Sequence, residues 1–328
     1  MIIKSMAVVG FAAFTFVSVY GQAPARADET KFIRIGTGNQ TGTWPPLGIQ
    51  MAKIINANVK GVKATSLLGA GVANIKNIQT GRIEIGFSTT TSEAKSIKGD
   101  KPFGTKHDKP MHLFSMYPIV AQFAVKKDGS IKSYSDLVKG SHRINANTRG
   151  STTYNVLKSI LGTYDITDES IVKAGGVVNY VAYADGVAQM QDGNIEMTGA
   201  IGPVPHNVIL QLVENPGVRL LALDAARAKH LADTLPGYFA TTIKAGSYKG
   251  IAEDVSSIGI GTNVLATSDL SEDVVFKVMT AIFDNISDIH GLFAAAKAIT
   301  QADGPKNNIY PLHPGARKFY KSKGIKVN

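Results

Sequence analysis

The 328-residue chain contains no cysteine. It cannot form a disulfide, so its hydrophobic core must stabilise the fold without covalent cross-links. A lipid-modified cysteine after the N-terminal apolar segment is excluded for the same reason. Tryptophan occurs once, at Trp44, and beyond the first 27 residues no apolar run approaches the roughly 20 residues that a transmembrane helix needs. We therefore expect no stable membrane insertion of the mature chain.

The first 27 residues have the pattern of an export signal. Lys4 precedes an apolar run over residues 6–20, which Ala25-Arg26-Ala27 follows. A positive start, an apolar middle and an A-x-A site are typical of a secretory signal peptide. The alternative, a membrane anchor, is less favoured because the run is short. We predict cleavage after Ala27. The formal net charge of +10 favours anionic partners only weakly, and general solubility explains it equally well.

Two stretches of the chain resemble each other. IQTGRIEIGF at 78–87 and MQDGNIEMTG at 190–199 share the order apolar-Gln-x-Gly-x-Ile-Glu-apolar. This order predicts a helix end, a glycine in the left-handed conformation and then a strand. A second pair agrees, since the apolar run at 32–35 leads into GTGNQTGTW and that at 143–144 leads into NANTRGSTTY. The pattern predicts two lobes with similar α/β units.

The spacing of apolar residues predicts a helix after each of these loops. Residues 47–55 and 156–161 carry apolar side chains along one helical face. Strands that alternate with helices predict mostly parallel sheets, which bind ligands beyond the carboxyl ends of their strands. Four loops are therefore expected to face one cleft; they are 36–46, 88–92, 146–153 and 201–207.

The order of elements also predicts how the chain divides. The apolar stretch 113–126 is expected to cross between lobes. Lobe 1 is expected to comprise residues 28–119 with about 224–328, and lobe 2 about 120–223. The expected strand 258–266 is left open to either lobe. Further helices are expected at 271–285, 287–298 and near 314–322.

Motifs for catalysis and cofactor binding are missing. Gly36 and Gly38 lack a third glycine at the dinucleotide spacing, and Thr43 stands where a P-loop has lysine. A Ser-x-x-Lys match at 92–95 lacks its companion motifs, the Gly-x-Ser-x-Gly and zinc-protease motifs are absent, and the seven histidines lie apart. Basic residues are scattered without interleaved aromatics, which argues against nucleic acid as a partner. We predict no enzyme activity, no cofactor and no metal. An enzyme on the same scaffold would have only Glu93, His206 and Arg149 to use.

Several segments match one known family in order. They are GTGNQTGTWPPLG at 36–48, NIKNIQTGRIEIGF at 74–87, Tyr117-Pro118, and PLHPGA within the segment 309–325. Over nearly the whole mature chain, the sequence resembles the TAXI family of extracytoplasmic solute receptors, the binding components of TRAP transporters. The resemblance implies an α/β, two-lobed periplasmic binding protein of a type II-like fold, with the ligand in the cleft between the lobes. It also implies a periplasmic location and delivery of a small organic acid to an ion-driven TRAP permease.

The sequence departs from the family pattern at the expected ligand site. Trp44-Pro45-Pro46 replaces a common Tyr-Tyr-Pro, Thr89–Thr91 replaces Gln-Ser-Asp, and Thr148-Arg149 replaces small residues. An ammonium group needs acceptors, and the position of the family's aspartate holds Thr91. Arg149 offers a bidentate partner for a carboxylate. We therefore expect a carboxylate ligand without an amino group. A glutamate or glutamine receptor of the same family and a ligand-sensing subunit for a receptor kinase remain alternatives.

The resulting set of predicted ligand-binding residues comes from the four loops and from the helix that follows residues 69–71. It consists of Thr37, Gly42, Thr43, Trp44, Asn74, Thr89, Thr90, Thr91, Arg149, Ser151, Thr152, Thr153, His206 and Asn207.

Overall fold

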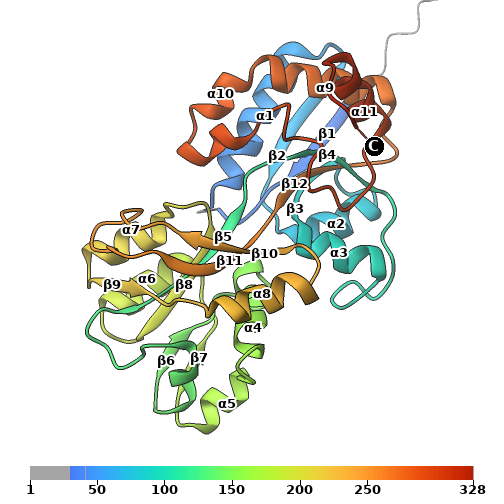
Figure 1. The fold of residues 1–328 in the computed structure, drawn as a ribbon. Coiled ribbons are helices and arrows are strands. Elements are labelled where there is room, and N and C mark those ends of the chain that lie inside the picture. The colour runs from blue at the N-terminus through green and yellow to red at the C-terminus, as the bar shows by residue number, and fades with distance from the viewer. Residues whose placement is uncertain (1–29, 41, 328) are drawn as a thin grey trace, which may run out of the picture.

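The structure, a computed structural model, describes residues 30–40 and 42–327. The predicted signal peptide and its cleavage site lie outside the described residues. Within these ranges no helix has both the length and the apolar character needed to cross a membrane. The described chain forms two sheets, each flanked by helices, which Figure 1 shows one above the other.

The first sheet has five strands in the order β2-β1-β3-β12-β4. β1, β2 and β3 pair in parallel, whereas β12 runs antiparallel to both β3 and β4. The sheet is thus mostly parallel, as predicted, apart from β12. Its strands are β1 (Lys31–Gly36), β2 (Val62–Leu67), β3 (Ile85–Thr89), β4 (Pro110–Ser115) and β12 (Thr262–Thr267). Its helices are α1 (Trp44–Asn58), α2 (Gly71–Gln79), α3 (Thr90–Lys98), α9 (Glu272–Asp284), α10 (Ile286–His290) and α11 (Pro314–Ser322), with the 3₁₀ helix η2 (Ala294–Ala298).

The second sheet is mixed rather than mostly parallel. Its strand order is β10-β11-β5-β8-β6-β7, with β9 also paired to β5. Only β6, β7 and β8 pair in parallel. β5, which enters from the first sheet, runs antiparallel to β8, β9 and β11. The strands are β5 (Ile119–Lys126), β6 (Arg143–Asn145), β7 (Val177–Asn179), β8 (Met197–Gly202), β9 (Val218–Leu220), β10 (Tyr238–Ile243) and β11 (Val255–Ile260). The helices are η1 (Tyr134–Val138), α4 (Thr152–Gly162), α5 (Asp168–Lys173), α6 (Tyr183–Gln191), α7 (Asn207–Glu214) and α8 (Ala225–Thr234).

The chain passes between the sheets twice. The predicted crossing at 113–126 is confirmed, since β4 belongs to the first sheet and β5 to the second. The predicted strand 258–266 is instead two strands that separate at Gly261, where the chain returns to the first sheet. A hydrogen-bonded pair fixes this return, because the Thr90 amide donates to the Gly261 carbonyl and the Gly261 amide donates to Thr90 Oγ1, both at 3.0 Å. β10 and β11 lie in the second sheet; the sequence assigned residues from about 224 onward to lobe 1 and left the strand 258–266 open to either lobe.

The helices follow the predicted apolar faces. Leu47, Met51 and Ile55 are fully buried on α1, and Ile160 is fully buried on α4. α9 and α11 lie where the sequence predicts them, whereas the expected helix 287–298 is divided into α10 and η2. The spacing of apolar residues therefore predicted where the helices lie, but it did not predict the break between α10 and η2.

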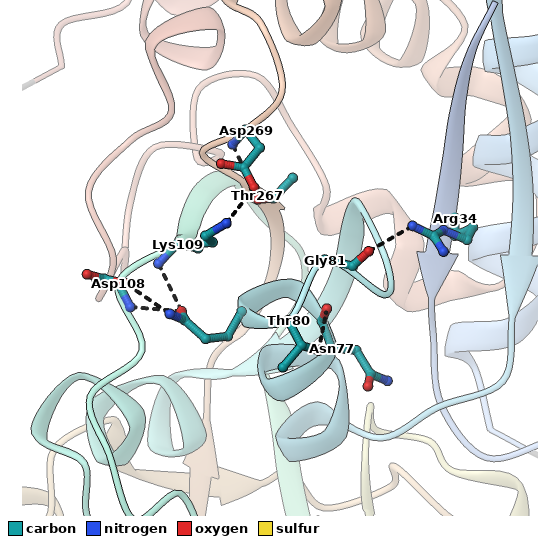
Figure 2. Close-up of polar contacts among 9 residues, drawn as sticks. Arg34, Asn77, Thr80, Gly81, Asp108, Lys109, Thr267 and Asp269 are labelled. Atoms are coloured by element: carbon teal, nitrogen blue, oxygen red, sulfur yellow. Dashed lines mark hydrogen bonds and ion pairs between the residues drawn. The ribbon is translucent and has the colours of Figure 1, made fainter.

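The internal similarity is visible in matching polar contacts. Gly81 (φ +70°) and Gly193 (φ +79°) both adopt the predicted left-handed conformation. Arg34 Nη2 donates to the Gly81 carbonyl at 2.9 Å, as Figure 2 shows, and its backbone amide donates to Glu84. In the second sheet Arg143 donates to the Gly193 carbonyl at 3.1 Å, and its amide donates to Glu196. The two units are thus built on the same local plan.

Candidate functional site

A cavity of about 400 Å³ lies between the loops of the two sheets. The first sheet contributes residues from segments 38–44 and 69–76, and the second contributes residues 148–153. Single residues complete the walls; they are Ile119, Tyr183, Ile201, Gly202 and His206. The cavity therefore lies where the strand–helix loops of both sheets meet, as the sequence predicts for a ligand cleft.

Five helices start at the wall of this cavity: α1, α2, α4 and α6 with their first residue, and α7 with its N-cap residue His206. The first turn of any helix leaves N–H groups without intrahelical acceptors. At α2 no side chain caps them, since the N-cap residue is Ala70 and the turn holds no acid. At α4 the Ser151 hydroxyl accepts from the Tyr154 amide at 3.2 Å. The open start of α2 therefore offers the N–H groups of Gly71 and its neighbours to an anion.

The charged side chains that line the cavity are basic. They are Lys76 and Arg149, and no aspartate or glutamate is among the described residues of the wall. The Arg149 guanidinium carbon lies 3.7 Å from the centre of the Tyr180 ring. The Tyr180 hydroxyl donates to Asp168 at 2.7 Å, and burial together with this bond raises the pKa of Tyr180 to about 12. The stacked ring thus holds Arg149 at the cavity by a cation–π contact.

Aromatic and apolar groups form the remaining walls on the side of the first sheet. Trp44 is half-buried and packs edge-on against Phe87, with ring centres 5.9 Å apart. The Thr43 hydroxyl lies 2.8 Å from the Tyr117 hydroxyl, and burial raises the pKa of Tyr117. These groups are uncharged at neutral pH, so this wall suits the apolar or flat part of a ligand.

His206 forms part of the wall on the side of the second sheet. Its Nδ1 accepts from the Val208 amide at 3.2 Å and so caps α7. Burial lowers the pKa of His206 to about 4, which leaves the ring neutral near pH 7. Gly202 must be glycine here, because a Cβ would lie 2.2 Å from His206 Cδ2. His206 therefore contributes shape rather than positive charge.

Eight of the predicted residues line the cavity. They are Gly42, Thr43, Trp44, Arg149, Ser151, Thr152, Thr153 and His206. All come from three of the four predicted loops. The fourth, 88–92, does not reach this cavity, and the start of α2 takes its place.

The other predicted residues lie elsewhere. Thr37 is buried and donates to the Leu67 carbonyl at 2.7 Å, Thr89 caps α3, and Thr90 binds the crossing at Gly261. Thr91 lines a second, adjoining cavity. Asn207 is exposed at the start of α7.

Asn74 is the buried residue whose role differs most from the prediction. Its side-chain nitrogen lies within 3.0 Å of the carbonyls of Gly36, Thr37 and Phe87. It holds the ends of β1 and β3 together and does not face the cavity. The sequence prediction missed Lys76 and Tyr183, which do line it. The available signal for Lys76 was the segment Gly69-Ala70-Gly71, since its glycines mark a close backbone approach before a helix.

The described residues contain no group of three or more His, Asp or Glu side chains arranged to hold a metal ion.

A family model matches residues 35–324, which is most of the chain; its description is the NMT1-like family. The chain belongs to the NMT1-like family. Among solved structures, this NMT1-like protein is similar to PhnD1 from Prochlorococcus marinus in complex with methylphosphonate. The TM-score is 0.51 at 11% identity, over 82% of this chain and 92% of that one. It also matches the periplasmic aliphatic sulphonate binding protein SsuA from Escherichia coli, with a TM-score of 0.46 at 13% identity over 82% and 79% of the two chains. The two helix-flanked sheets are those of the type II periplasmic binding protein fold.

Proposed function

We propose that this NMT1-like protein is a periplasmic solute-binding protein that captures a small organic anion and delivers it to a membrane transporter of the TRAP type. One observation carries the proposal. The cavity between the two sheets contains Lys76, Arg149 and the open start of α2, and no carboxylate is among the described residues of its wall. Helix dipoles and basic side chains both favour a negative ligand at such a place.

The chemistry of the walls favours an organic carboxylate. Arg149 can bind two carboxylate oxygens at once, which gives orientation as well as affinity. Trp44, Val72 and Ile119 provide apolar surface for the body of the ligand. An ammonium group would find no acidic partner among these residues, so a plain carboxylate is favoured over glutamate or glutamine.

The double crossing of the chain supports a closing motion. We place one lobe around the first sheet and the other around the second, joined at residues 116–118 and at Gly261. A rotation of the lobes about these two connections would bury the ligand, because both lobes contribute to the cavity wall. Ligand contacts that form only in the closed state would shift the population toward it. Binding and release need no chemical step, which agrees with the missing catalytic motifs.

Isothermal titration of the mature protein with plain carboxylates, amino acids and other small anions tests this function. Trp44 is the only tryptophan of the sequence and lines the cavity, so its fluorescence gives a second readout. We expect Arg149→Gln to weaken carboxylate binding by about tenfold to a hundredfold, the range for a lost charged hydrogen-bonding partner. Arg82→Gln removes the same charge at an exposed site outside the cavity and should leave binding unchanged.

If Arg149→Gln binds carboxylates as tightly as the wild type does, this cavity is not the anion site. Tight glutamate binding without binding of plain carboxylates would overturn the carboxylate part of the proposal. Co-purification with a receptor kinase, instead of with transporter subunits, would favour the sensing alternative.

A further inference from the structure

A second cavity of about 220 Å³ adjoins the first. The two share three wall residues, Val72, Gly150 and Thr152. The second cavity is partly open and is bordered by the start of α3, the loop 101–103, one side of α4 and Tyr238 of β10. A ligand in the first cavity could therefore extend into the second without leaving the space between the two sheets.

The second cavity repeats the charge pattern of the first. Lys95 and Lys101 line it, and no aspartate or glutamate is among its described wall residues. Neither lysine belongs to an ion pair within the part of the chain that the structure describes. Thr91 and Ser92 add hydroxyls from the first turn of α3, and both residues are buried. Each cavity thus has two basic side chains that form no ion pair with a carboxylate among the described residues.

A contact between the cavities keeps the loop 101–103 in place. Lys76 lines the first cavity, and its Nζ donates to the Pro102 carbonyl at 2.7 Å. The same ammonium lies 5.6 Å from the centre of the Phe103 ring, which is buried. These contacts fasten the loop to α2, so Lys101 stays at the wall of the second cavity.

We propose that the second cavity is a subsite for a second anionic group of the same ligand. The ligand would then be an elongated dianion, such as an unbranched α,ω-dicarboxylate, rather than a monocarboxylate. This inference rests on the proposed function, because it assigns the first anionic group to the cavity at Arg149. Lys95 and Lys101 are exposed at the wall of the second cavity, and positive charges grouped at adjoining cavities attract a doubly charged anion more strongly than a singly charged one.

Matched pairs of ligands test the subsite. Isothermal titration would compare α,ω-dicarboxylates from succinate to azelate with monocarboxylates of equal carbon number, at fixed ionic strength. For the wild type we expect at least one dicarboxylate to bind about tenfold or more tightly than its matched monocarboxylate. The double variant Lys95→Gln/Lys101→Gln should lose this advantage and keep its affinity for the monocarboxylate.

A second double variant controls for net charge. Lys98→Gln/Lys106→Gln removes two exposed lysines that line neither cavity, so the dicarboxylate advantage should remain. The subsite is overturned if Lys95→Gln/Lys101→Gln keeps the advantage, or if the wild type shows none while binding monocarboxylates through Arg149. If the wild type binds neither ligand class, the proposed function and the subsite both fail.

Discussion

In each of the two strand–helix–strand units, β1–α2–β3 and β6–α6–β8, an asparagine amide is buried between the helix start and a strand end, but a different element supplies it. In the first unit Asn74 on α2 supplies the amide, and Gly36 at the end of β1 gives it room. A Cβ at Gly36 would lie 2.6 Å from Asn74 Oδ1. In the second unit Asn145 at the end of β6 supplies the amide. Gly186 on α6 gives it room, and a Cβ there would lie 2.3 Å from Asn145 Nδ2.

The amide between the helix start and the strand end therefore comes from the helix in the first unit and from the strand in the second, and a glycine on the opposite element makes room for it. The two helix starts differ in charge as well. Neither helix has a side-chain cap, but α6 carries Asp185 in its first turn, whereas α2 carries no acid. The first unit therefore keeps a positive helix end at the cavity, and the second unit supplies its positive charge through Arg149. The two units thus share a scaffold but differ in the groups that bring positive charge to the cavity, where Lys76 of the first unit also lies.

The largest effect is expected from removing the amide of the first unit. Asn74→Ala would take the donor from the carbonyls of Gly36, Thr37 and Phe87, which lie in a fully buried region. Since each unsatisfied buried group costs about 1–3 kcal/mol, we expect the free energy of unfolding to fall by about 3 kcal/mol or more. Chemical denaturation measures it.

Asn207→Ala, at an exposed site, is the matched control and should change stability by no more than about 0.5 kcal/mol. Equal losses in the two variants would contradict the role given to Asn74.

The sequence predicted the parts of these units that local chemistry determines. Gly81 and Gly193 were recognisable because a helix that ends in the left-handed conformation selects glycine. The buried face of α1 was recognisable from its spacing. Arg149 and Trp44 were placed at the cavity because loops between strand ends and helix starts meet there.

Long-range contacts determine the parts that the sequence did not predict. Thr90 turns to the crossing because β12 passes beside it, and that neighbour is far away in the chain. The amide of Asn74 reaches strand ends whose position depends on the assembled sheet. The mixed order of the second sheet follows from the exchange of β5 and β12 between sheets, which no local pattern shows.

A buried acid beside the first sheet gives the next expected effect. Glu93 on α3 is fully buried; its Oε2 accepts from Asn263 at 3.0 Å, and Oε1 has no hydrogen-bond partner among the described residues. Burial raises the pKa of Glu93 to about 8, from an ordinary value of 4.5. Because the folded state holds this proton more tightly, its contribution to stability is full below pH 4.5 and is lost as the pH rises through about 8.

Glu93→Gln should therefore flatten the fall in stability between about pH 6 and pH 8. The slope that it removes is at most about 1.4 kcal/mol per pH unit. Denaturant titrations at several pH values measure the slope for both proteins. His112 and His206 have pKa values lowered to about 4 from an ordinary 6.5, so they add a rise in stability between those two values, which wild type and variant share. Parallel curves for wild type and variant would show that Glu93 is not the titrating group.

The smallest effect is expected at the start of α2, which lacks the first-turn acid that α6 carries. Ala70 is the N-cap of α2, with an extended backbone at φ −159° and ψ 150°. Asparagine and aspartate are both good N-caps, so Ala70→Asn and Ala70→Asp should each stabilise the unliganded protein by up to about 1 kcal/mol. Aspartate also places a fixed negative charge where the ligand anion is expected.

We therefore expect Ala70→Asp to weaken anion binding by about tenfold or more, and Ala70→Asn to weaken it less. Thermal unfolding without ligand and isothermal titration with ligand separate the two effects. Equal weakening by both variants would mean that capping, not charge, competes with the ligand for the open N–H groups. Unchanged binding in both would mean that the ligand does not use the start of α2. The difference between the capped α4 and the uncapped α2 would then concern helix stability alone, and Arg149 would supply the recognition of the anion.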